Sequence, residues 1–97
     1  MENSNCYEII VRDLTQNPIP REAIEGLVSY FKLKIQKVAV SKKSTEEKAN
    51  NINSIINDIV IEILKIRKEI LDIKTKAIIE ESVYKLYNEF QKRDVER

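Results

Sequence analysis

The chain has no histidine, no tryptophan and a single cysteine, Cys6, in 97 residues. Without histidine it cannot by itself build a histidine-based catalytic triad or a Cys/His zinc site, and one cysteine cannot form an intrachain disulfide. We expect Cys6 to be a small buried apolar residue. These shortages favour a protein that is not an enzyme and needs no metal or other cofactor.

Turn-forming residues are scarce as well, with one glycine and two prolines, and a sheet-rich fold normally uses more. No apolar run approaches the roughly 20 residues that cross a bilayer, and the N-terminus lacks a basic-then-apolar signal pattern. The net charge of +1 gives no overall attraction to nucleic acid or membrane. We therefore expect an intracellular protein of the cytoplasm or nucleoid, with no membrane contact and no small-molecule substrate.

Isoleucine at helical spacing is what the sequence has in abundance. Seven isoleucines and then Ala77 follow one another at alternating steps of four and three residues. The isoleucines are Ile52, Ile56, Ile59, Ile63, Ile66, Ile70 and Ile73. This heptad stripe predicts one apolar face of a long helix, which forms a core or a partner interface and implies an oligomer or another protein partner.

The start of this helix is marked by Ser44, which Glu47 follows in the spacing of a capping box. We therefore predict a helix over about 45–73. Further apolar residues such as Ile55 and Leu64 widen its face beyond a coiled-coil seam, which favours a bundle over a lone zipper. The sequence thus predicts an all-α fold, a bundle of about four helices round one long central helix, in a single domain over 1–97.

The remaining helices are less sharply marked. Apolar spacing predicts a short helix over 6–14, a helix from the prolines to about residue 40, and a last helix after a bend near 74–78. Alternation within Glu8–Arg12 leaves a strand open as a second interpretation. The charged tail over 92–97 is predicted to be frayed.

Polar candidates for a site are few. Lys34, Lys37, Lys42 and Lys43 lie in a stretch without acidic residues and are candidate contacts for DNA phosphates, although a solvated helix edge explains them equally well. Adjacent helical residues diverge, so we interpret Glu80–Glu81 as acids near a helix N-terminus, not as a catalytic pair. Tyr84 and Tyr87 are predicted to pack in the core.

The chain also resembles the helical domain of the GINS replication proteins, in particular the smaller archaeal subunits. The likeness runs from Leu14–Pro20 through Tyr30–Phe31 and the capped helix at Ser44. It is greatest at Ile63–Ile70, and Glu80–Tyr87 is similar to that family's final helix. The family normally carries a small β-rich domain, for which these 97 residues have no room.

This resemblance implies a non-catalytic scaffold, one subunit of a complex that joins the replicative helicase to a RecJ-like partner. It also implies that the isoleucine stripe supplies core and subunit contacts. The residues themselves are also compatible with two other functions. One is a small DNA-binding regulator that uses the basic loop or a ribbon-helix-helix fold. The other is a viral or plasmid inhibitor or adaptor that docks through a helix face.

Overall fold

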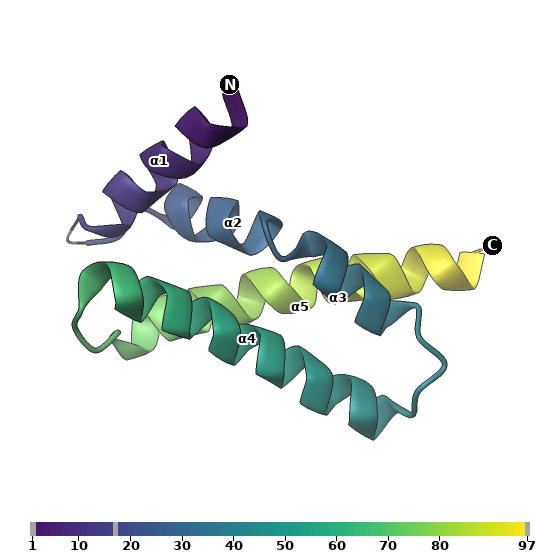
Figure 1. Ribbon diagram of the computed structural model, residues 1–97. Helices are drawn as coiled ribbons and strands as arrows, with labels where there is room; N and C mark the ends of the chain where they lie inside the picture. The colour runs from purple at the N-terminus through teal and green to yellow at the C-terminus, as the bar shows by residue number, and fades with distance from the viewer. Residues whose placement is uncertain (1, 17, 97) are drawn as a thin grey trace.

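The protein is all-α, as predicted (Figure 1). The computed structural model describes residues 2–16 and 18–96, with side chains described for 7–16 and 18–93. This part of the chain contains no strand and five helices. They are α1 (Glu2–Leu14), α2 (Arg21–Ser29), α3 (Lys32–Ala39), α4 (Thr45–Arg67) and α5 (Ile73–Glu96).

The helices form a flat bundle with principal extents of 40 × 32 × 17 Å. Packed helices lie about 8–10 Å apart, so the smallest extent corresponds to two layers. The two long helices organise the rest: α5 packs against α2, α3 and α4, and α4 also packs against α1 and α3. Figure 1 shows α4 and α5 joined by a turn at one end of the bundle, close to the connection between α1 and α2.

Helix α4 begins where the sequence predicts. The hydroxyl of Ser44 accepts a hydrogen bond from the backbone N–H of Glu47 at 3.2 Å. It ends at Arg67, earlier than the predicted end at Ile73, because Lys68 adopts a left-handed conformation with φ 60° and ψ 29°. The Lys68 N–H closes the last turn on the carbonyl of Leu64 at 2.7 Å. A left-handed residue stops a helix at its C-terminus, and it normally favours glycine.

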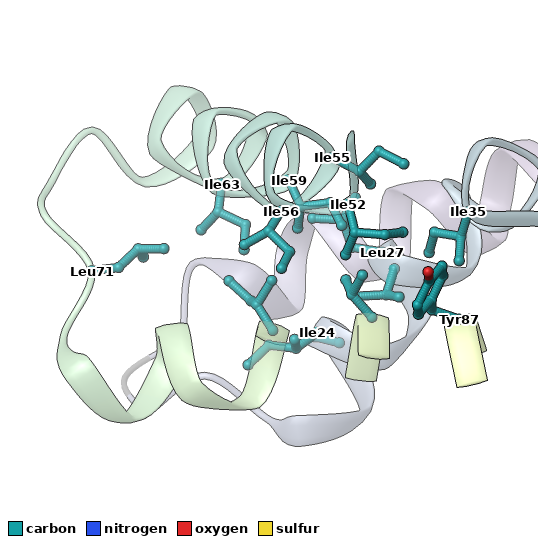
Figure 2. Close-up of a cluster of buried hydrophobic side chains, with 14 of the residues drawn as sticks. Ile24, Leu27, Ile35, Ile52, Ile55, Ile56, Ile59, Ile63, Leu71 and Tyr87 are labelled. Carbon is teal, nitrogen blue, oxygen red and sulfur yellow. The ribbon is translucent and has the colours of Figure 1, made fainter. Parts of the chain in front are cut away.

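The isoleucine stripe forms the core along α4 and leaves it where the helix stops. Ile52, Ile56, Ile59 and Ile63 are buried, and Ile66 is half-buried. Figure 2 shows the α4 isoleucines together with Leu71, which points from the turn toward the same core. Ile70 and Ile73 are 89% and 86% exposed, so the core ends before them. The stripe was predicted to form a core or a partner interface, and for these two residues only the second role stays a prediction.

The helix predicted from the prolines to about residue 40 is two helices, α2 and α3. The N–H groups of Tyr30 and Phe31 bond to carbonyls three residues back, which tightens the turn and breaks the helix. No glycine or proline marks the break. The only glycine, Gly26, lies inside α2, where a Cβ atom would come within 2.9 Å of Ile10 Cδ1 on α1. Close packing of α1 against α2 at this position accounts for the glycine.

The chain ends differ from prediction in their bounds. Helix α1 begins at Glu2 instead of residue 6, and it includes Glu8–Arg12, so the strand that a ribbon-helix-helix fold needs is not formed. The bend falls at 68–72 and not at 74–78, and α5 runs to Glu96. The fraying predicted for the tail over 92–97 stays a prediction. The side chain of Cys6 lies outside the described residues.

Candidate functional site

A hydrophobic surface lies at the turn between α4 and α5. Ile70 and Ile73 are the two most exposed large apolar side chains among the described residues. Beside them is a groove of about 350 Å³, which Ile70 itself helps to line. We call this surface the turn patch: Ile70 and Ile73 with the apolar groove residues Pro18, Ile19, Leu71 and Ile78.

Arg67 holds the two sides of this groove together. Its Nη1 atom donates to the carbonyls of Leu14 at 2.7 Å and Gln16 at 2.8 Å, and its Nη2 atom pairs with the carboxylate of Glu69. The side chain is only 9% exposed, so its planar fork makes these bonds in a mostly dry place. The α1–α2 connection, which carries Pro18, is thereby fixed against the turn.

Asp72 fixes the other end of the turn. Its Oδ1 atom accepts the backbone N–H of Thr75 at 2.8 Å in the first turn of α5, the position of an N-cap. Hydrogen bonds from the side chain and backbone of Thr75 lower the pKa of Asp72, and the nearby Lys74 and Arg67 charges add to this. The turn patch is therefore held on both flanks by polar contacts.

Three charged side chains beside the isoleucine stripe are engaged within the chain. Arg67 and Glu69 pair with each other, and Glu62 accepts the hydroxyl of Tyr7 at 3.0 Å. Burial, followed by the contact with Glu62, raises the pKa of Tyr7. The isoleucine stripe contained no signal for these partners, because they lie outside its heptad pattern.

The candidate DNA contacts are exposed lysines of α3 and the loop that follows it. We refer to this group as the lysine face: Lys32, Lys34, Lys37, Lys42 and Lys43. None of the five forms an ion pair with a described residue. The Nζ atom of Lys34 lies 5.6 Å from the centre of the Phe31 ring. Leu33, which precedes Lys34 in the sequence, is 70% exposed.

The acids and tyrosines of α5 have structural contacts. Glu81 pairs with Arg21 of α2 at 2.7 Å, and this contact raises the pKa of Arg21. Because α5 begins at Ile73, Glu80 and Glu81 lie beyond its first turn, so their predicted role at the helix N-terminus is wrong. Tyr87 is buried, which agrees with core packing. The half-buried Tyr84 lies edge-on to Tyr87 at 6.2 Å and donates to Asn53 Oδ1.

A second hollow, of about 340 Å³, lies between α2 and α5. Ser82 lines it, and its hydroxyl is the buried side-chain polar atom without a hydrogen-bond partner in the described part of the chain. Within residues 7–16 and 18–93 no group of three or more Cys, Asp or Glu side chains is placed to hold a metal ion. No helix among the described residues is long and apolar enough to cross a membrane.

Comparison of the chain with protein-family models, with curated proteins and with solved structures found no match. The class that the fold defines is a two-layer, all-α bundle. The turn patch and the lysine face are its two exposed surfaces from which a function can be inferred.

Proposed function

We propose that this protein is a non-catalytic assembly protein whose turn patch docks another protein chain. The observation that supports this is the exposure of Ile70 and Ile73 beside an apolar groove. Contact with water makes such a surface unfavourable in the free chain, and docking removes that cost. Proteins that expose a contiguous apolar patch commonly use it for binding.

The resemblance to GINS proteins supplies a specific form of this proposal. In that form the chain is one subunit of a replication complex, and its partners are other subunits or the replicative helicase. The buried isoleucines of α4 form the core of the subunit, and the exposed Ile70 and Ile73 make the contact between subunits.

Affinity purification of the tagged chain from its native host, with mass spectrometry of the co-purifying proteins, tests the proposal. The comparison is between the wild type and a double variant, Ile70→Asp with Ile73→Asp. We expect the wild type to recover a partner in stable ratio and the double variant to lose it. Ile61→Asp is the matched control, because Ile61 is 49% exposed on α4 and does not line the groove.

Two observations decide the result: which proteins co-purify with the wild type, and which of them the double variant loses. Helicase or other replication subunits lost only in the double variant would support the replication form. A different partner lost in the same way would leave the docking function and refute the replication form. Equal recovery of every partner by both proteins would refute docking of those partners at the turn patch.

The lysine face favours a second function, binding to the phosphates of nucleic acid. Five exposed lysines without ion pairs among the described residues leave a local positive charge, although the whole chain is nearly neutral. Phosphate contacts release counterions, so binding would weaken steeply with salt. This function uses a different side of the molecule from the turn patch and does not exclude docking.

Fluorescence anisotropy with labelled duplex DNA at low and rising salt tests this second function. Changing Lys34, Lys37, Lys42 and Lys43 to glutamine should weaken binding and reduce the salt slope by about 0.9 for each phosphate contact removed. The matched control removes the same charge elsewhere, by changing Lys65, Lys76, Lys85 and Lys92 to glutamine. Absence of binding at low salt would refute the function.

A further inference from the structure

The turn patch has a projection and a hollow side by side. Ile73 is almost fully exposed and does not line the groove, whereas Ile70 forms part of the groove wall. The remaining apolar wall comes from the α1–α2 connection, the turn and the start of α5, through Pro18, Leu71 and Ile78. One surface of one chain therefore carries both an aliphatic side chain to insert and an apolar hollow to receive it.

The charges around the groove balance. Arg67 and Lys74 are positive, Glu69 and Asp72 are negative, and all four line it. A surface of zero net charge has no attraction for nucleic acid or an anionic membrane, and it does not repel an identical surface. Arg67 forms an ion pair with Glu69, whereas Lys74 makes no ion pair with a described residue. Two facing copies can place each Lys74 near the acids of the other.

A two-fold dimer uses the same surface of both chains, so every contact occurs twice. We propose that the occupant of the turn patch is a second copy of this chain, with Ile73 of each copy seated in the groove of the other. This inference rests on the proposed function, because it takes the same patch as the docking surface, and it names the partner. It requires no rearrangement of the bundle, since the turn is already held by Arg67 and Asp72.

The size of the patch sets the expected affinity. Ten residues line the groove, fewer than the about 20–30 that one side of a standard interface uses. We therefore expect a weak dimer, with a Kd on the order of 10–100 µM. Because the patch has no net charge, the dimer should depend little on salt.

Sedimentation equilibrium over a range of concentrations around that Kd tests the proposal. Wild type should pass from monomer to dimer, and Ile73→Asp should weaken the dimer more than about 30-fold, as a central interface residue does. Ile61→Asp should leave it unchanged. Because Ile73 is exposed, Ile73→Asp should also keep the wild-type circular dichroism and melting behaviour, which separates loss of the dimer from loss of the fold.

Disulfide trapping in a Cys6→Ser background tests the geometry. One chain carries Ile73→Cys and the other carries Pro18→Cys, on the groove wall. We expect the mixed disulfide to form faster than with Ile61→Cys in place of Ile73→Cys. Equal rates of disulfide formation by Ile73→Cys and Ile61→Cys would overturn the proposed docking geometry.

The outcomes separate this inference from the proposed function. A chain that stays monomeric at every concentration overturns the dimer. If the Ile70→Asp and Ile73→Asp double variant then still loses a different protein partner, the proposed function stands and only self-docking fails. If it loses none, both fail. A dimer that persists in Ile73→Asp uses another surface and also overturns the inference.

Discussion

Ile63 and Ile70 occupy equivalent positions in one heptad stripe, yet one is fully buried and the other is 89% exposed. Between them lies Lys68, whose positive φ ends α4. Before that residue the stripe faces α5 and the other helices, and after it the stripe faces solvent. The comparison shows that a regular apolar repeat identifies residues that prefer burial, but it does not guarantee that a single helix carries all of them.

The sharpest test of this comparison is the same substitution on both sides of Lys68. Ile63→Asp buries an unpaired carboxylate in the core and should lower the free energy of unfolding by more than about 4 kcal/mol. Ile70→Asp should change it by less than about 0.5 kcal/mol, because the side chain is already in water. Urea unfolding followed by circular dichroism measures both. Equal effects would mean that the two positions do not differ in burial.

Removal of the Arg67 side chain should have the next largest effect. Arg67→Ala leaves the carbonyls of Leu14 and Gln16 without their donor and should cost about 2–3 kcal/mol of unfolding free energy. Arg67→Lys restores the charge without the planar fork, so it should recover only part of this loss. Glu69→Gln is the control, because it removes the ion pair and keeps both carbonyl bonds. Full recovery by lysine would show that charge alone is needed.

A substitution at Lys68, the left-handed residue that ends α4, should raise the stability of the turn. Lys68→Gly places the residue without a Cβ penalty at φ 60° and should stabilise the protein by about 1 kcal/mol. Lys68→Val puts a β-branched residue there and should destabilise it. Thermal melting measures both variants. A destabilising glycine would indicate that Lys68 does not hold the left-handed conformation in solution.

The smallest effect concerns pH and Asp72. Hydrogen bonds from Thr75 lower the pKa of Asp72 in the folded chain, so the carboxylate contributes stability above the unfolded pKa, and this contribution is lost as pH falls through the lower folded value. Asp72→Ala should therefore reduce the difference in stability between neutral pH and about pH 3. Urea midpoints at both pH values measure it. An unchanged difference would contradict the cap.

The sequence predicts much of this fold because the strongest signals are local and periodic. Ser44 and Glu47 mark the start of α4 through a cap that one turn of backbone determines. The spacing of Ile52 to Ile63 predicts the buried face correctly, since only a helix places those residues together.

The end of α4 and the candidate site were not predictable in the same way. Lys68 is not a residue that sequence rules associate with a left-handed helix end, and the spacing of Ile70 and Ile73 happens to continue the stripe through the turn. The groove also needs Pro18, which lies far away in the sequence and is brought there by the bonds of Arg67. Such contacts depend on tertiary packing, which no local pattern records.

The bonds of Arg67 have a consequence for the order in which the protein forms. They join side chain and carbonyls that are 53 and 51 residues apart. During synthesis from the N-terminus, α1 and α2 are complete long before residue 67 leaves the ribosome, so the hydrogen bonds of Arg67 form late. Forming these bonds also requires the chain to close a loop of more than 50 residues, so this step is non-local and slow compared with the formation of each helix. The turn patch therefore takes shape only after residues 67–78 have left the ribosome.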